Sequence, residues 1–168
     1  MIIKPILSLK NNPLKLCKFI PLMRDFFLSK NCKMIKKVEH IGIAVKDLQA
    51  SQKLMEDLLD TKMYKTETVN SEGVSTGFFQ VGETKIELLE ATNKQSPIAK
   101  FIEKRNEGIH HIALDVDDIY TEMERLQKLG FIILNETPKK GADNKLVCFL
   151  HPKSTNGVLV ELCQEIKE

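Results

Sequence analysis

The sequence predicts an α+β fold made of two tandem modules, each with the element order β-α-β-β-β. The first observation is a gap-free internal repeat, in which residues 40–48 read HIGIAVKDL and residues 111–119 read HIALDVDDI. The second is that a helical apolar pattern and then runs of strand length follow each copy. The third lies near the end of each module, where Ile86-Glu87-Leu88 resembles Val160-Glu161-Leu162. Such repeats indicate two copies of one structural unit.

The repeat also sets the expected domain organisation. A chain of 168 residues is long enough for one domain or for two small modules that share a core. We expect the folded part to be residues 34–168, with module one at 38–92 and module two at 108–165. Residues 96–105 between them are expected to form a linking helix, because Pro97 suits the first turn of a helix.

Module one is expected to begin with the strand that contains residues 40–48. A helix follows, predicted from apolar residues at helical spacing, namely Leu48, Leu54, Met55, Leu58 and Leu59. Asp47 precedes this helix and is expected to cap its first free amides. Two strands are predicted next, at Gly77–Val81 and Thr84–Leu89, and Gly82-Glu83 between them suits a hairpin turn.

Module two is expected to repeat this order from residue 111 onward. Its helix is predicted from Ile119, Met123, Leu126 and Leu129, with Asp118 as the cap and Gly130 as the stop. Three strands are predicted after it, at Phe131–Asn135, Leu146–Leu150 and Gly157–Cys163, and the stretch Lys139–Lys145 is predicted to be a loop.

Composition excludes several classes of protein. Apolar residues make up 42% of the chain, yet no run approaches the roughly 18 apolar residues that a membrane span requires. Residues 34–168 carry 18 basic and 22 acidic residues, a net charge of −4, so no nucleic-acid partner is expected. None of the four cysteines lies in a CxxC pair, and Cys148 and Cys163 are expected to be reduced and buried.

Residues 1–33 differ in composition from the rest of the chain. They hold seven basic residues and one acidic residue, and Pro5, Pro13 and Pro21 interrupt any long helix. Organelle transit peptides are basic, poor in acid and amphipathic, so a transit peptide is the favoured interpretation. The alternatives are a disordered extension and an upstream start, with Met34 as the first residue of the folded part.

Four polar residues interrupt apolar strands at equivalent positions of the two modules. They are His40 and His111 on the first strands, and Glu87 and Glu161 on the last. Singly, each is more often a hydrogen-bonded strand residue than a ligand. Together, two imidazoles and two carboxylates near a pseudo-twofold axis suit one divalent ion of Zn, Mn, Co, Fe or Ni, whereas Ca²⁺ prefers ligands that are all oxygen.

Six short segments between about Val38 and Gln164 recur in a known family. They are HIGIAV, TKIELLE, SPIAKFIEK, GIHHIALDVDDI, FLHPKST and GVLVEL. In this order they closely resemble the methylmalonyl-CoA epimerases of the vicinal oxygen chelate superfamily, which also contains glyoxalase I and the extradiol dioxygenases. The resemblance implies a glyoxalase-like fold, in which two βαβββ modules form a pair of half-barrels.

The resemblance implies a metal-dependent epimerase that interconverts (R)- and (S)-methylmalonyl-CoA through an enolate intermediate in propionyl-CoA catabolism. By the same resemblance His40, His111 and Glu161 are metal ligands, and Glu87 stands where the family has Gln or Glu at the metal. The implied ion is Co²⁺, with Mn²⁺, Zn²⁺, Ni²⁺ and Fe²⁺ as alternatives. The resemblance further implies a homodimer and, together with residues 1–33, a mitochondrial location.

The chain departs from the family pattern at two places. Some members carry a catalytic Glu three residues after the Gly of a Gly-Val motif, whereas this chain has Thr76 at that distance from Gly73. Because Thr cannot act as a general base near neutral pH, we expect Glu87 to take that role, paired with Glu161 as the second acid/base. The segment Gly141–Asn144 also lacks the second Gly that the family usually shows.

Three other readings of the fold stay open at the sequence level. A glyoxalase I-type lyase acting on glutathione thiohemiacetals would use four similar ligands. An extradiol dioxygenase would use two His and one Glu as a facial triad. A non-enzymatic binding module of the same fold is disfavoured, because all four ligand positions are intact.

A few further polar residues are expected to lie outside the metal site. His110 neighbours His111 on a strand, so it should face away from the metal. The segment His151-Pro152-Lys153 is favoured as a rigid turn, with Lys153 on a CoA phosphate or substrate carboxylate as the alternative. Lys104 and Arg105 are expected to be solvated, and CoA phosphates are again the alternative.

Overall fold

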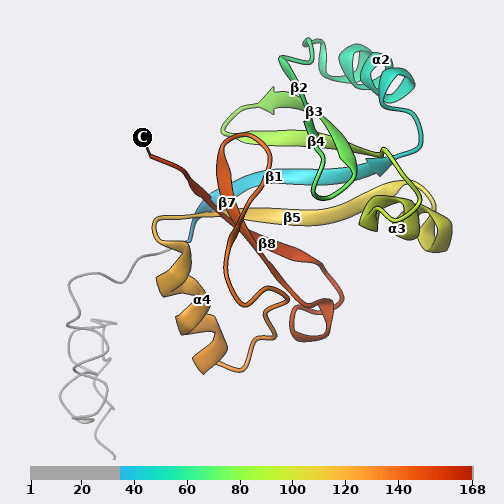
Figure 1. Cartoon of the computed structure of the whole chain (residues 1–168). Helices are drawn as coiled ribbons and strands as arrows, with labels where there is room; N and C mark the ends of the chain where they lie inside the picture. The colour runs from blue at the N-terminus through green and yellow to red at the C-terminus, as the bar shows by residue number, and fades with distance from the viewer. Residues whose placement is uncertain (1–34, 168) are drawn as a thin grey trace, which may run out of the picture. The chain divides into compact units, whose positions relative to one another are not determined.

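The computed structural model describes residues 35–167, which form one mixed eight-stranded sheet with three helices (Figure 1). A 3-10 turn at Pro152–Ser154 lies between the last two strands. In chain order the elements are β1 (Ile35–Val45), α2 (Leu48–Leu59), β2 (Lys65–Val69), β3 (Val74–Val81), β4 (Thr84–Ala91), α3 (Pro97–Arg105), β5 (Gly108–Val116), α4 (Ile119–Lys128), β6 (Lys139–Lys140), β7 (Lys145–Leu150) and β8 (Val160–Glu165).

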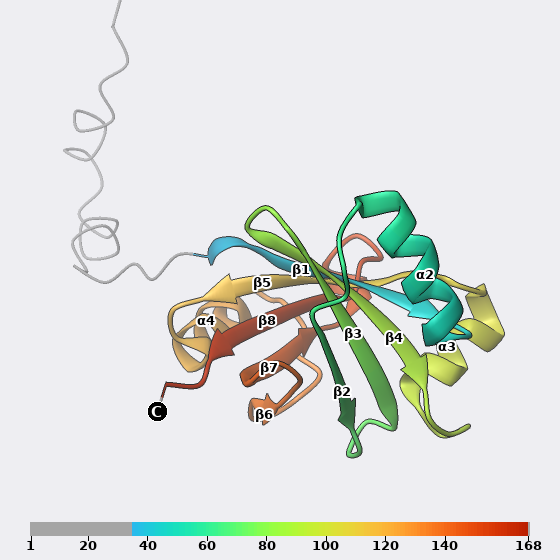
Figure 2. The same ribbon diagram turned by 90° about the horizontal axis from the view of Figure 1, so that it is seen from above.

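The sheet has the symmetry expected of two repeated modules. Its strand order is β2-β3-β4-β1-β5-β8-β7-β6. At the centre β1 pairs antiparallel with β5, while β1 runs parallel to β4 and β5 runs parallel to β8. The order of strands outward from the central pair is therefore the same on both sides, and Figure 2 shows both halves of the sheet twisting away from that pair. This confirms the predicted α+β class and the two tandem modules.

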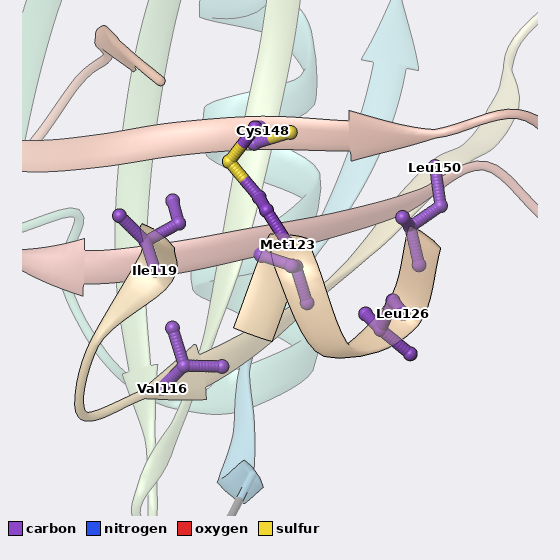
Figure 3. Close-up of a cluster of buried hydrophobic side chains, with 7 residues drawn as sticks. Val116, Ile119, Met123, Leu126, Cys148 and Leu150 are labelled. Carbon is purple, nitrogen blue, oxygen red and sulfur yellow. The ribbon is translucent and has the colours of Figure 1, made fainter. Parts of the chain in front are cut away.

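Equivalent helices cover the outer face of each half of the sheet. Helix α2 packs against β3 and β4, and helix α4 packs against β7 and β8. The core under α4 is drawn in Figure 3 and consists of Val116, Ile119, Met123, Leu126, Cys148, Leu150 and Leu162. The core under α2 is its counterpart and contains Val45, Phe79 and Leu88. Because side chains alternate along a strand, the residues next to these point to the opposite, inner face.

Helix α3 lies on that inner face, at one end. Its buried Ile98 packs against Ala44, Val74 and Leu89, which point away from α2. The helix starts as predicted, since Pro97 occupies its first turn and the side chain of Ser96 accepts a hydrogen bond from the Ile98 amide. The linking helix therefore closes one end of the inner face.

Both predicted aspartate caps are confirmed. The Ala50 amide donates to Asp47 at 2.9 Å, and the Thr121 amide donates to Asp118 at 3.0 Å. Each cap stands at the turn from a central strand into an outer helix. The repeated Asp of the two modules thus fixes the same change of chain direction twice.

The sequence missed one strand and misplaced another. Strand β2 escaped notice because its residues, KTETV, alternate polar groups without an apolar run. The strand predicted at Phe131–Asn135 is wrong, since Ile133 makes only an isolated bridge to Leu150 there. Its residues Phe131 and Ile133 pack against the core under α4 instead. The short strand β6 lies inside the stretch Lys139–Lys145 that was predicted to be a loop.

Other sequence expectations have simpler outcomes. Cys148 and Cys163 are free and buried, as predicted. The predicted strand at 157–163 begins only at Val160, because Gly157 has a positive φ and belongs to the turn after Pro152–Ser154. No helix within residues 35–167 is long and apolar enough to cross a membrane. The predicted transit peptide at 1–33 lies outside the described residues.

Candidate metal centre and its cavity

The sheet register brings the four repeated polar residues onto its inner face. In one cross-strand row, His40 of β1 is paired with Ala113 of β5, which is paired in turn with Glu161 of β8. In the neighbouring row, Gly42 of β1 lies between Glu87 of β4 and His111 of β5. The pseudo-twofold axis exchanges the two rows, so each module contributes one imidazole and one carboxylate.

All four side chains are buried, and their polar atoms converge. The Nε2 atoms of His40 and His111 lie 2.9 Å apart. Glu87 Oε2 lies 3.3 Å from Nε2 of His40 and 3.6 Å from Nε2 of His111. Glu161 approaches from the other side, with Oε2 3.4 Å from His111 Nε2 and Oε1 4.0 Å from His40 Nε2. Four donor groups therefore surround one point.

These distances fit a divalent ion. Donor atoms about 2.0–2.2 Å from one ion stand roughly 2.8–3.6 Å apart when they occupy adjacent positions. Ligand atoms of His40, His111 and Glu161 all lie within 4.8 Å of one another, and Glu87 reaches both imidazoles from β4. Without an ion, two buried carboxylates and two facing imidazole nitrogens would need shared protons. The residues present thus suit a mixed nitrogen and oxygen metal site.

Gly42 makes room for the His111 ring. A Cβ atom built at Gly42 would lie 2.3 Å from Cε1 of His111 and 2.6 Å from its Nδ1, much closer than carbon atoms can approach. The imidazole therefore lies directly over the backbone of β1. Only glycine at this position permits the ring to sit where its Nε2 meets that of His40.

Burial and charge shift the protonation of the metal-free cluster. Burial raises the pKa of Glu87 to about 7 and the pKa of Glu161 to about 8. Burial alone would lower the pKa of His40, but its hydrogen bond to Glu39 and the nearby carboxylates raise it to about 9. Burial and the positive charge of His40 hold the pKa of His111 well below its usual range. The cluster is therefore a place where protons are readily exchanged near neutral pH.

The cluster forms the floor of a cavity of about 300 Å³. Pro97 and Ile98 of α3 line one end, Phe78 and Phe149 add apolar surface, and Lys145 adds a buried cation. Thr76 also lines the cavity and is buried, but its hydroxyl donates to the Glu67 carbonyl at 3.3 Å. The cavity thus presents carboxylates at Glu87 and Glu161, and a hydroxyl at Thr76.

A second hollow adjoins this cavity. The two share Pro97, His110 and Leu159 in their walls. The second hollow is basic on the side of α3, through Lys100, Lys104 and Arg105, and Pro152 lies on its other side. Lys104 and Arg105, which we expected to be a solvated face, are exposed and also border this hollow. The expected turn at His151–Lys153 is confirmed as the start of the 3-10 turn Pro152–Ser154.

The expectation that His110 faces away is wrong. Its ring lies edge-on to that of His111, with 5.3 Å between the ring centroids, and the two Nδ1 atoms are 3.0 Å apart. His110 also lines the cavity, although its ring nitrogens are not among the four converging donors. Burial lowers its pKa to about 4, so the ring is neutral.

Sequence reasoning missed a buried ionic group beside the cluster. Glu39 Oε2 lies 2.5 Å from Nδ1 of His40, and its Oε1 lies 2.6 Å from Lys85 Nζ and 3.5 Å from Lys145 Nζ. Lys85 continues to Asp143 at 2.6 Å. The available signal was a charged residue at the edge of an apolar strand, but strict alternation assigns Glu39 to the opposite face from His40.

Comparison with known proteins gives a family and several close relatives. Residues 39–149 match the model of the glyoxalase/bleomycin resistance protein/dioxygenase superfamily. A mitochondrial methylmalonyl-CoA epimerase of Dictyostelium discoideum is 43% identical over 129 residues, which cover 76% of this chain and 78% of that protein. An ethylmalonyl-CoA/methylmalonyl-CoA epimerase of Cereibacter sphaeroides is 42% identical, covering 78% of this chain and 99% of the relative.

A solved structure agrees with these sequence matches. It is a methylmalonyl-CoA epimerase in complex with methylmalonyl-CoA and NH₄⁺, and it is 30% identical to this chain. It superposes with a TM-score of 0.76 and covers 79% of this chain and 96% of the solved one. Sequence and structure comparisons therefore point to the same group of proteins.

Proposed function

The chain belongs to the glyoxalase/bleomycin resistance protein/dioxygenase superfamily, within its methylmalonyl-CoA epimerases, and we propose that it interconverts (R)- and (S)-methylmalonyl-CoA. The observation that carries this proposal is the pair of buried carboxylates, Glu87 and Glu161, on opposite sides of a two-histidine centre. An epimerase needs one group to remove a proton from one face of a carbon atom and another to return a proton to the opposite face.

His40, His111, Glu161 and Glu87 are the proposed metal ligands. Their support is the convergence of four buried donor groups at separations suited to one ion. When bound, the ion supplies a positive charge that stabilises the negative charge developing on the thioester oxygen. Co²⁺ is the proposed ion, with Mn²⁺, Zn²⁺, Ni²⁺ and Fe²⁺ as alternatives, since imidazole and carboxylate suit all of them.

Glu87 and Glu161 are the proposed proton carriers. They project from β4 and β8, which lie on either side of the central pair β1 and β5. A substrate α-carbon above the two histidines would thus have one carboxylate near each face. Burial raises the pKa of both groups toward neutrality, which suits groups that must both accept and release a proton.

The apolar wall around these carboxylates excludes water from the proposed reaction. Phe78, Phe149 and Ile98 line the cavity. A weakly acidic C–H proton transferred in such surroundings meets few competing water molecules. Lys145, buried at the same cavity, is the proposed cation for the free carboxylate of the substrate, which would join its ion pairs with Glu165 at 2.9 Å and Glu39 at 3.5 Å.

One assay series tests the reaction. Purified protein is stripped of metal, reloaded separately with each of the five divalent ions, and given (S)-methylmalonyl-CoA, methylglyoxal with glutathione, or catechols. We expect epimerisation of methylmalonyl-CoA with at least one ion and no turnover of the other substrates. Turnover of the glutathione thiohemiacetal or of catechols, without epimerisation, would assign the chain to another branch of the superfamily.

The CoA arm is proposed to leave the cavity through the second hollow. The two spaces share Pro97, His110 and Leu159, and the basic residues Lys100, Lys104 and Arg105 face the outer one. CoA carries a diphosphate and a 3′-phosphate, which such cations would hold. Replacing Lys104 and Arg105 by Ala should raise KM for methylmalonyl-CoA by about threefold to tenfold.

A truncated substrate tests whether this rise in KM comes from lost contacts with the CoA phosphates. Methylmalonyl-pantetheine lacks the charged nucleotide part, so its KM should be the same in the wild type and in the double variant. Lys128→Ala, an exposed lysine on the outer helix α4, is the control for a general loss of positive charge. Equal effects on both substrates would show that Lys104 and Arg105 do not contact the CoA phosphates.

Two further properties are part of the proposal. We propose a homodimer, following the family resemblance, and light scattering of the purified protein at several concentrations tests it. We also propose a mitochondrial location, supported by the basic, acid-poor residues 1–33. Fractionation of cells that express the tagged chain would contradict this location if the protein stayed outside the mitochondrial fraction.

A further inference from the structure

Two β-bulges stand at equivalent places in the central strand pair. In β1, Val38 pairs with Leu114 and His40 pairs with Ala113, so Glu39 is an extra residue without a partner position on β5. A bulge of this kind adds one residue to one strand and re-aims the side chains around it. The interruption falls one residue before the proposed ligand His40.

The second bulge is the counterpart of the first in module two. Gly42 pairs with His111 and Ile43 pairs with Ile109, so His110 is the extra residue of β5. It falls one residue before the proposed ligand His111. The pseudo-twofold axis that relates the two histidines therefore also relates Glu39 to His110.

Each extra residue contacts the same atom of the histidine that follows it. Glu39 Oε2 lies 2.5 Å from Nδ1 of His40, and His110 Nδ1 lies 3.0 Å from Nδ1 of His111. Neighbouring residues on a regular strand point to opposite faces, so neither contact could form without the bulge. Both contacts leave the Nε2 atoms directed at the four-donor cluster.

We propose that Glu39 and its counterpart His110 are positioning residues that fix the orientation and tautomer of the two metal-binding histidines, with Glu39 the stronger of the two. This inference rests on the proposed metal site. Histidine ligands of metals usually pass their second ring N–H to a carboxylate or another acceptor, which sets the tautomer and turns the other nitrogen toward the ion.

The chemistry of the two contacts differs. A carboxylate only accepts hydrogen bonds, so His40 carries its proton on Nδ1 and presents a lone pair at Nε2. Between two imidazoles one nitrogen must donate, and His111 fills that role when its Nε2 holds a lone pair for the metal. A bond to an ionised acceptor is roughly twice as strong as one between neutral groups, so the two halves of the site are unequal.

The carboxylate of Glu39 is itself held in place. Its Oε1 lies 2.6 Å from Nζ of Lys85. Lys85 lies on β4, directly opposite His40. Lys85 reaches Asp143 at 2.6 Å, and Asp143 meets Lys65 at 3.0 Å. Asp143 adopts a left-handed conformation with φ 52°, which Asp tolerates better than most residues. Asp143 belongs to the segment Gly141–Asn144, which lacks the second Gly usual in the family. Its side chain holds Lys85, and Lys85 in turn holds Glu39.

The experiment measures zinc binding by competition with a chelator, without any activity assay. The wild type is compared with Glu39→Gln, Glu39→Ala and His110→Ala. Glu122→Gln is the control, because Glu122 is equally buried but pairs with Arg125 on α4, outside the cavity. Loss of such a supporting partner typically weakens metal binding by about 10–100-fold, and we expect this for Glu39→Ala.

The other variants grade the effect. Glu39→Gln should lose less zinc affinity than Glu39→Ala, because its amide oxygen still accepts a hydrogen bond from Nδ1 of His40 but carries no charge. His110→Ala should also lose less zinc affinity than Glu39→Ala. Long-range ¹H–¹⁵N spectra of the zinc-loaded protein should show the His40 proton on Nδ1 in the wild type and in Glu39→Gln. In Glu39→Ala that signal should exchange rapidly or be lost, a change that a purely structural role would not cause.

The outcomes separate the two proposals. A wild type that binds no divalent ion would defeat the metal site, and the positioning role with it. A wild type that binds zinc, beside a folded Glu39→Ala with unchanged affinity, would defeat the positioning role alone. Should Glu39→Ala fail to fold by circular dichroism, Glu39→Gln decides: a zinc affinity equal to that of the wild type would overturn the inference.

Discussion

The Nε2 atoms of His40 and His111 lie 2.9 Å apart, although 71 residues separate them in the chain. The contact exists because β1 and β5, the first strands of the two modules, pair antiparallel at the centre of the sheet. Each module by itself supplies one imidazole and one carboxylate, which is too few for a stable site. The proposed metal centre therefore depends on the packing of the two repeats.

Removing either histidine should remove the metal. His40→Ala and His111→Ala are each expected to lose bound divalent ion and activity together, while the fold survives in part. The physical reason is that the remaining three donors leave one side of the ion open and lose a strong nitrogen ligand. Metal analysis after dialysis and circular dichroism check this, and full metal content in both variants would contradict the proposed site.

Adding a single methyl group at Gly42 should disturb the site from below. In Gly42→Ala the new Cβ would meet the His111 ring at 2.3 Å, so the imidazole must move away from His40. We expect metal affinity to fall by about tenfold or more, comparable to the loss of a supporting contact. Ala113→Gly, which trims the equivalent position beside His40, is the control and should keep its metal.

Glu87 should matter for proton transfer more than for metal binding. Glu87→Gln is expected to keep the metal, because an amide oxygen can still coordinate, and to lose epimerisation by about 10²–10⁴-fold. Glu161→Gln should behave worse, since it weakens metal binding as well. Proton exchange in D₂O is the sharper readout, because one epimer should still exchange its α-proton slowly.

A contrary result for Glu87 has a defined meaning. Near-normal turnover by metal-loaded Glu87→Gln would show that the second acid/base lies elsewhere, for example in a water molecule held by Thr76. Thr76→Val, which keeps the shape but removes the hydroxyl, would then test that assignment. In the proposed scheme Thr76→Val should leave turnover largely unchanged, because its hydroxyl already bonds the Glu67 carbonyl.

The stability of the metal-free protein should fall as pH rises from about 5 to about 9, the span between the unfolded-state pKa values of the two glutamates and the folded-state pKa of His40. The pKa values of Glu87, Glu161 and His40 are all raised in the fold, to about 7, 8 and 9. A raised pKa contributes stability that is complete below the unfolded-state value and is lost as pH rises through the folded-state value. His111, whose pKa is lowered, destabilises the fold only on the acid side.

Metal binding should have the opposite pH dependence. An ion requires deprotonated ligands, so binding releases protons and grows stronger with pH. The rise in Tm on adding zinc should therefore increase between about pH 6 and pH 8, as the ligands lose their protons. Thermal melts in EDTA and in zinc measure it, and a metal-induced shift that shrinks with pH would contradict the proposed ligand set.

Residues 34–168 should fold and work without the preceding segment. Lys33–Glu168 forms a compact unit by itself, and all four proposed ligands lie within it. A chain beginning at Met34 is expected to bind metal and epimerise at the rate of the full chain. Insolubility or inactivity of the shortened chain would show that residues 1–33 take part in the fold.

The sequence alone was sufficient to predict the features that recur in both modules. The matched HIGIAVKDL and HIALDVDDI segments determined the two central strands, the capped helices after them and the histidine positions. The recurrent Ile-Glu-Leu and Val-Glu-Leu determined the carboxylates. These features are local, since a strand, a cap and a buried polar residue each leave a pattern in a few consecutive residues.

The tertiary structure decided what depends on pairing between distant strands. Whether Phe131–Asn135 forms a strand depends on a partner, and there it finds only an isolated bridge at Ile133. The role of Gly42 appears only once His111 of the other module lies over it. His110 was assigned to the wrong face and Glu39 was missed, because a bulge exists only relative to the neighbouring strand. A register between segments about 70 residues apart is a collective property of the packed sheet, and alternation along one strand cannot encode it.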